Sequence, residues 1–422
     1  MAMPAPDTDA PGPNRATPYG WLVFALIVLL LLSDYMSRQV LGAVTPLLKA
    51  EWHLSDEQLG RLGSVIPLMV GLLTFPLSLA ADRFGRVRAI VAMALVWSVA
   101  TLSCGLASTF GELLAARAVI GFGEAAYGSA GLAVVLGAFP VRMRAMLTAG
   151  FMAGGPLGSV VGVALGGSIA ADHGWRWAFA AMGIGGCIIA LAFAAIAREA
   201  RLAPPQAKER APIRSVIAGR ALRWVYVGSG LQLFICGVIT FWLPSYFGRV
   251  QGYGVAEAAQ LAAVVLLAQA VGMVLCGMLS DRIAGTEHGE RRFAIAAGVG
   301  LASAALLTSA FLLPPSPLQM ALLLAGTFVA AGTTGPVGSL VAQLTPAALH
   351  GTAFAVVTLA NNAFGLAPGP WLAGWLADRL PLDRALALCA LVPLGAALAF
   401  ILAARAYRAS QPLGLGDGVA RA

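Results

Sequence analysis

The sequence predicts an all-α membrane protein in which twelve transmembrane helices form two pseudo-symmetric six-helix bundles. Of its 422 residues, 59% are hydrophobic and only 11% are charged, a composition far from that of soluble globular domains. Long apolar stretches follow one another along the whole chain. Short motifs of the first half also recur, in the same order, in the second half. These observations together predict the fold class.

The internal repeat consists of three pairs of short motifs, each pair separated by about 200 residues. Ser78–Arg86 ends one apolar stretch, and Gly277–Arg282 ends another with the same Asp-Arg pair. The other two pairs are Phe139–Ala145 with Thr345–Gly351, and Ala171–Asp172 with Ala377–Asp378. Parallel repeats of long hydrophobic segments are typical of a transporter built from two similar bundles.

The apolar stretches have the length of membrane spans, since about 20 apolar residues cross the hydrocarbon core as a helix. The predicted spans of the first half cover residues 19–43, 57–80, 88–108, 111–138, 145–169 and 176–197. Those of the second half cover residues 221–247, 257–280, 292–313, 317–341, 350–375 and 384–406. We therefore predict bundles over residues 19–197 and 221–408, tails over 1–18 and 409–422, and a polar connector over 198–220.

The distribution of lysine and arginine predicts the orientation, because cytoplasmic loops carry an excess of positive charge. With both termini in the cytosol, about three times as many of these residues lie on the cytosolic side as on the other. The net charge of +8 is therefore an orientation signal and does not predict a nucleic-acid partner. We expect a monomer in a bacterial-type inner (plasma) membrane, with the lipid bilayer and a small-molecule substrate as its partners.

Enzyme chemistry finds no support in the sequence. The four histidines lie at helix ends and loops without ligand spacing, so no metal site is predicted. Gly121–Ala126 superficially resembles a nucleotide-binding loop, but no strand precedes it and it lies within a span, where glycines serve close helix packing. We expect no cofactor and a proton gradient as the energy source.

Three motifs resemble those of the major facilitator superfamily, and the resemblance covers nearly the whole chain. Asp82–Arg86 is similar to the loop motif between the second and third helices, Arg117–Glu124 to the fourth-helix motif, and Gly154–Pro156 to the glycine–proline motif of the fifth helix. Segments similar to the spinster-like and anion:cation symporter branches are Gly123–Ala125, Trp175–Phe179 and Trp242–Tyr246. The resemblance implies the two-bundle fold and proton-linked transport of lysolipids or small organic anions.

The first helix departs from the family pattern, in which an acidic residue directly precedes the arginine. Here Ser37 precedes Arg38, and Asp34 lies one turn earlier. The coupling role that the resemblance implies for that acid therefore falls either to Asp34, from the same helix face, or to Glu124 alone.

Four ionisable residues lie deep within the predicted spans. At 1.5 Å per residue, Asp34 lies ~20 Å from the start of the first span and Glu124 roughly 20 Å from the start of the fourth. Both depths approach the middle of a ~40 Å bilayer. Asp34 and Arg38 share one helix face, and Arg117 and Glu124 share another. Ionisable side chains at such depth predict a functional site, because contact with hydrocarbon is costly.

Glu124 and Asp34 are the candidates for proton coupling, and Arg38 and Arg117 for substrate binding. Burial disfavours a carboxylate, whereas a nearby guanidinium group favours it, so we expect Glu124 to exchange a proton as its surroundings open to either side. Protonation releases an arginine to hold an anionic group of the substrate, which couples the two binding events. The alternative is that Glu124 and Arg117 form a permanent structural pair.

Further candidate substrate contacts are Tyr127, Asn361 and Asn362. Tyr127 is a candidate for lining a cavity, although anchoring at the membrane interface is the commoner use of such a ring. The two asparagines precede a Gly- and Pro-rich stretch, which is typical of interrupted helices that line cavities. They either orient the substrate or hold helices together through hydrogen bonds.

The repeated loop motif supplies a candidate conformational latch, formed by Asp82, Arg83, Arg86, Asp281 and Arg282. At the cytosolic mouths of the helices, the two aspartates can pair with arginines or helix N-termini across the bundle interface. The alternative is that each aspartate caps the following helix locally.

Three functions remain open. The first is proton-coupled import of a small organic anion, which two deep arginines with little opposing charge favour. The second is export of a lysolipid or an amphipathic drug, which the spinster-like first half and the apolar second half favour. The third is a transporter-like sensor that signals through a partner protein.

Overall fold

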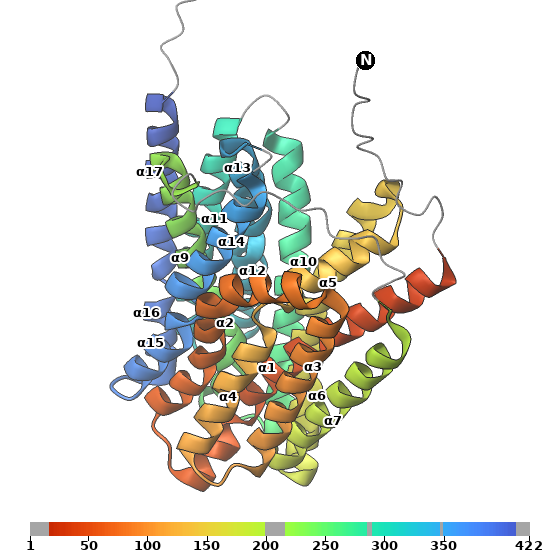
Figure 1. The fold of residues 1–422 in the computed structure, drawn as a ribbon. Helices are drawn as coiled ribbons and strands as arrows, with labels where there is room; N and C mark the ends of the chain where they lie inside the picture. The colour runs from red at the N-terminus through yellow and green to blue at the C-terminus, as the bar shows by residue number, and fades with distance from the viewer. Residues whose placement is uncertain (1–16, 199–215, 285–288, 347–348, 411–422) are drawn as a thin grey trace, which may run out of the picture.

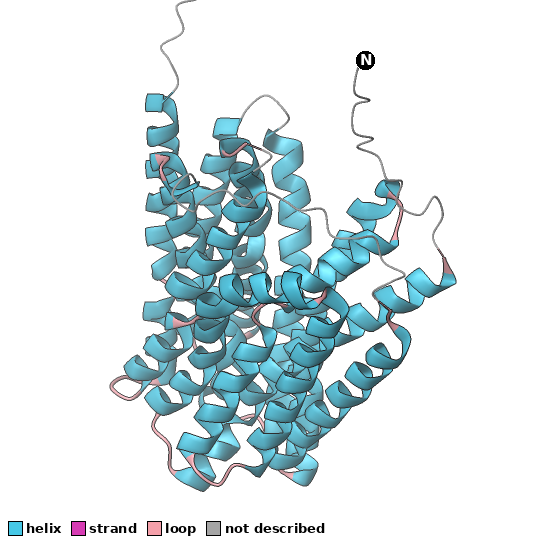
Figure 2. Ribbon diagram, viewed as in Figure 1, coloured by secondary structure: helices cyan, strands magenta, loops and turns pink. Residues whose placement is uncertain are grey.

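A computed structural model describes residues 17–198, 216–284, 289–346 and 349–410. Within these ranges every regular element is a helix, as Figure 2 shows. Eleven helices are long and apolar enough to cross a membrane. Most of the predicted connector and of both tails lies outside the described residues.

The first half contains the six predicted spans. Its helices are α1 (Pro18–Trp52), α2 (Asp56–Phe84), α3 (Arg86–Leu106), α4 (Phe110–Glu124), α5 (Tyr127–Ala138), α6 (Arg144–His173) and α7 (Trp175–Ile196). Helix α1 continues to Trp52, well past the predicted end at residue 43. Helices α4 and α5 together form the fourth span.

The second half repeats this arrangement. Its helices are α9 (Arg220–Val250), α10 (Val255–Ala284), α11 (Gly289–Leu312), α12 (Pro317–Ala330), α13 (Thr334–Leu344), α14 (His350–Asn361), α15 (Pro368–Ala377), α16 (Leu382–Cys389) and α17 (Val392–Ser410). A 3-10 turn at Ala331–Thr333 joins α12 to α13, at the place corresponding to the break between α4 and α5. The two halves therefore resemble each other also in where the helix is broken, between α4 and α5 and between α12 and α13.

The eleventh predicted span is interrupted, which is why eleven continuous candidates are found rather than twelve. Between α14 and α15 the chain forms a π-helical turn, Asn362–Leu366. Pro368 and Pro370 lack the N–H group that an α-helix needs, and a π turn within a helix often marks a functional site.

The helices of the two halves lie side by side in Figure 1, those of the first half in red to yellow and those of the second in green to blue. Within the first half, α1 packs against α6 and α7, and α3 against α4 and α7. The main contacts between the halves join α1 to α9, α2 to α15, and α6 to α10. This arrangement confirms the predicted all-α membrane fold of two bundles.

Small residues allow the closest contacts between helices. A Cβ atom added to Gly158 on α6 would lie 2.6 Å from the carbonyl oxygen of Leu32 on α1. Large apolar side chains are exposed on the outer surface, for example Ile188 and Leu191 on α7 and Val264 on α10. Outward-facing aliphatic side chains of this kind suit contact with lipid tails.

The bundles have two ends, which differ in the helix termini that they contain. The N-terminal face is the end at which α1 begins and α2 ends, and the distal face is the end at which α1 ends and α2 begins.

Candidate functional site

The deep ionisable residues of α1 and α4 form one cluster. The Arg38 Nε atom lies 2.7 Å from Glu124 Oε2 and 3.5 Å from Asp34 Oδ1. The Asp34 and Glu124 side chains are 3% and 0% exposed, while that of Arg38 is 17% exposed. Arg38 is therefore the most exposed of the three side chains.

Local structure places each of these groups. Asp34 and Arg38 are one turn apart on α1, the spacing at which opposite charges meet on a helix surface. Glu124 is the last residue of α4, just before the break that leads into α5. A negative charge at the C-terminal end of a helix is opposed by the helix dipole, and Arg38 supplies the compensating positive charge.

The two acids meet at the same guanidinium group, since Asp34 and Glu124 both lie next to Arg38 Nε. Asp34 therefore belongs to the cluster, although it lies one turn away from the place that the family pattern gives to its acid.

Arg117 is held by backbone carbonyl groups. Its Nε donates to Leu62 O at 2.7 Å and its Nη2 to Arg38 O at 3.4 Å, which ties α4 to α2 and α1. The residue is 2% exposed, and its Nη1 has no hydrogen-bond partner among the described residues. The ion pair of Glu124 is therefore made with Arg38 and not with Arg117.

Two tyrosines adjoin the cluster. The Tyr127 hydroxyl donates to Ile27 O at 2.6 Å, and its ring packs edge-on against Trp97 with centroids 5.0 Å apart. Tyr127 is 1% exposed, so its ring belongs to the packed interior of the first bundle. The Arg38 guanidinium lies 5.0 Å from the centre of the Tyr35 ring. Sequence reasoning gave Tyr35 no role, although its position next to Asp34 and one turn before Arg38 was a usable signal.

The two asparagines lie in the second bundle, at the junction of α14 and the π turn. Asn361 Oδ1 accepts from Ser229 Oγ on α9 at 2.7 Å. Asn362 Nδ2 donates to Thr358 O at 2.9 Å, whereas its buried Oδ1 has no partner among the described residues. A Cβ atom on Gly71 of α2 would lie 3.0 Å from Asn362 Cβ, so Asn362 lies at the contact between the bundles.

A comparison with known families supports the arrangement. The family model described as Major Facilitator Superfamily matches residues 27–370. The chain belongs to the Major Facilitator Superfamily. It is therefore a multi-pass membrane transporter and not an enzyme, as the sequence predicted.

Relatives of this superfamily member belong to both branches that the motifs suggested. Protein spinster homolog 3 of Danio rerio is 25% identical over 60% of this chain, and the match spans 53% of that longer protein. The D-galactonate transporter of Escherichia coli is 26% identical over 90% of this chain and 95% of its own length. A crystal structure of a bacterial homologue of the human lysosomal transporter spinster, described as inward-facing and unoccupied, matches 94% of this chain with a TM-score of 0.81 and 20% identity.

The latch candidates of this superfamily member lie at the N-terminal face. Asp82 and Arg83 lie in the last turn of α2, where the Arg83 side chain is exposed, and Arg86 begins α3. At the corresponding place in the second bundle, Arg282 is exposed. Asp281 lies 3.4 Å from Arg292 of α11, which is a contact within that bundle.

The described residues offer no metal centre to this transporter, since no group of three or more His, Cys, Asp or Glu side chains there is placed to hold an ion. The deep cluster itself consists of one guanidinium group and two carboxyl groups.

Proposed function

We propose that this transporter imports a small organic anion together with protons by alternating access. The observation that carries the proposal is the position of Arg38, which lies deep in the first bundle and is shared by Glu124 and Asp34. One guanidinium group with two acidic partners can exchange its counter-ion, whereas a single buried pair is held permanently.

Protonation would control the affinity of Arg38 for anions. With both carboxyl groups neutral, Arg38 lacks a counter-ion and attracts a carboxylate or sulfonate, which a guanidinium group can bind through two parallel hydrogen bonds. With Glu124 ionised, the ion pair at 2.7 Å re-forms and displaces the substrate. Protons and anion then favour each other's binding, as coupled transport requires.

Further contacts complete the proposed substrate site. Arg117 offers its unpartnered Nη1 as a second donor, and Asn362 offers its unpartnered Oδ1 from the second bundle. Asn361 has its Nδ2 group left for the substrate, since Ser229 occupies its Oδ1. Tyr127 acts through its bond to Ile27, which shapes the wall of α1 beside Asp34.

We place the chain in a bacterial plasma membrane as a monomer, with both termini in the cytosol. The bundles formed by residues 19–197 and 221–408 would rock against each other, joined by residues 198–220. Asp82, Arg83, Arg86, Asp281 and Arg282 would form the latch when the N-terminal face closes.

Export of a lysolipid or amphipathic drug is the second candidate. It is favoured by the relative that bears the spinster name and by the fold shared with the spinster homologue. Organic-anion import is preferred because Arg38 and Arg117 place two guanidinium groups deep in the first bundle, where they suit a small anionic substrate.

Transport by purified protein in liposomes distinguishes the two functions. We expect an inside-alkaline pH step to drive accumulation of labelled D-galactonate, with a matching acidification reported by enclosed pyranine. Saturable movement of lysophosphatidylcholine without response to D-galactonate would support the exporter instead. D-galactonate uptake that is indifferent to the pH step would contradict proton coupling.

A further inference from the structure

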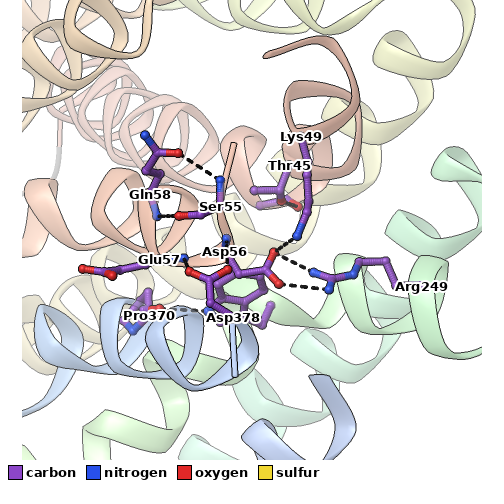
Figure 3. A network of polar contacts seen from close by, with 11 residues as sticks. Thr45, Lys49, Ser55, Asp56, Glu57, Gln58, Arg249, Pro370 and Asp378 are labelled. Carbon is purple, nitrogen blue, oxygen red and sulfur yellow. Dashed lines mark hydrogen bonds and ion pairs between the residues drawn. The ribbon is translucent and has the colours of Figure 1, made fainter. Parts of the chain in front are cut away.

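The two bundles are joined at the distal face by a compact polar network, drawn in Figure 3. Six hydrogen bonds join residues 56–64 of α2 to the second bundle. Their partners are Arg249 at the end of α9, Trp371 of α15, and Asp378 just after α15.

Asp378 caps the N-terminus of a helix in the other bundle. Its Oδ1 accepts from the Asp56 N–H at 2.7 Å and its Oδ2 from the Glu57 N–H at 2.9 Å. The neighbouring N–H groups of α2 are satisfied locally, because Ser55 N–H bonds Gln58 Oε1 and Gln58 N–H bonds Ser55 Oγ. The free N–H groups at this end of α2 are thus shared between its own capping box and a carboxylate from the second bundle, placed where the helix dipole favours negative charge.

Asp56 forms the second part of the network. Its side chain is 2% exposed and accepts from both terminal nitrogens of Arg249, at 2.8 and 2.9 Å. Lys49 of α1 pairs with the same carboxylate. Separating the bundles would leave Asp56 with Lys49 alone, and a buried charge that loses a partner is costly.

Backbone contact accompanies these polar contacts. A Cβ atom on Gly374 of α15 would overlap the carbonyl oxygen of Asp56. Trp371 N–H also donates to Ser64 Oγ at 3.1 Å. Helices α2 and α15 therefore touch closely beneath the cap.

We propose that Asp56, Arg249, Gly374 and Asp378 form a distal lock, a conformational device that keeps the transporter closed at its distal face and must open before the deep cluster can reach that face. The carboxylate of Asp378 is the central element of the lock. It balances the partial positive charge at the N-terminus of α2 and accepts hydrogen bonds from two N–H groups there. The inference goes beyond the proposed function, since it does not depend on which solute or ion is carried.

The internal repeat provides a matched control. Asp172 lies in the last turn of α6, 206 residues before Asp378 and in the same motif. It is exposed, and no hydrogen bond or ion pair of its side chain is found in the described part of the chain. Among the described residues, Asp172 therefore has no role that corresponds to that of Asp378 in the lock. Asp172→Asn removes the same charge as Asp378→Asn and leaves the lock intact.

Spin-label distances test the lock in the full chain, with the five native cysteines replaced and labels at Ser108→Cys and Pro315→Cys. These exposed positions lie in the distal loops between α3 and α4 and between α11 and α12. We expect Asp378→Asn to raise the population of a longer, distal-open distance at least fivefold, and Asp172→Asn to match the parent. Equal distance distributions for the two variants would overturn the proposal.

A second pair of variants distinguishes opening of the lock from misfolding. Gly374→Ala should produce the same longer distance without changing any charge, whereas Gly298→Ala, whose added Cβ meets nothing within 4 Å, should not. If neither Asp378→Asn nor Gly374→Ala gives folded protein, these residues are needed for assembly of the bundles, and the assignment as an opening device is wrong.

Discussion

At the scale of single residues, the proposed chemistry depends on how Arg38 divides its charge between two acids. Glu124 is its nearer partner, and Asp34, one turn before it on α1, is the second. The pair of acids comes from two helices, so a shift between α1 and α4 alters which carboxyl group the guanidinium contacts.

Glu124→Gln removes the nearer acid and mimics its protonated form. We expect the variant to bind D-galactonate and exchange it across the membrane, but to lose accumulation driven by a pH step, because the proton-binding group is gone. Uptake into liposomes with and without the pH gradient measures this. Glu112→Gln on the exposed first turn of α4 is the control and should keep coupling. Normal pH-driven accumulation in Glu124→Gln would refute the proton-coupling role.

Arg38→Lys keeps the positive charge and removes the planar fork. We expect the apparent affinity for D-galactonate to fall about tenfold, because an ammonium group cannot bind a carboxylate through two parallel N–H donors. Concentration-dependent uptake gives the affinity. Arg61→Lys, at an exposed ion pair on the distal face, should leave it unchanged. An unchanged affinity in Arg38→Lys would exclude Arg38 as the anion anchor.

At the scale of helices, hydropathy predicted where most spans begin and end. The prediction of 57–80 compares with Asp56–Phe84 for α2, and 176–197 with Trp175–Ile196 for α7. Hydropathy does not record the hydrogen-bonding pattern, so it missed the break after Glu124. The Gly- and Pro-rich stretch after Asn362 did predict an interrupted helix, which the structure confirms, although it did not predict the π-helical form of the interruption.

Contacts between helices were harder to predict than the helices themselves. Spacing on α4 suggested Arg117 as a structural partner of Glu124, yet the partner is Arg38 of α1. The distal lock was not predicted at all, because Asp56 and Asp378 lie in different halves and resemble ordinary residues at helix ends. Which helix ends meet depends on packing between the bundles, and neither hydropathy nor motif spacing describes that packing.

The contact between α1 and α6 gives a prediction at this scale. Gly158→Ala should lower the free energy of unfolding by about 1–3 kcal/mol, because the added Cβ overlaps the backbone of α1 at Leu32 and forces the helices apart. Thermal unfolding of detergent-solubilised protein measures the loss. Gly185→Ala on α7, where a Cβ meets nothing within 4 Å, should be neutral. Equal melting temperatures for both variants would contradict close packing of α1 on α6.

At the scale of the whole molecule, the two faces differ in how far their basic side chains are paired with acids. On the distal face, Lys49 and Arg249 pair with Asp56, Arg61 pairs with Glu57, and Arg176 pairs with Glu51. On the N-terminal face, the side chains of Arg83 and Arg282 are exposed, and Arg408 reaches Glu290 from an exposed position. The positive charge of the distal face is thus largely neutralised by acids, which leaves the N-terminal face as the more basic one.

This asymmetry predicts that the distal face lies outside the cytosol, because basic loops are retained on the cytosolic side. In a bacterial host, with the native cysteines replaced, a membrane-impermeant maleimide should label Pro315→Cys in intact cells. Arg282→Cys should be labelled only in inverted vesicles or permeabilised cells, which also show that its thiol is reactive. The opposite pattern would reverse the orientation. The distal lock would then close the cytosolic side of the transporter.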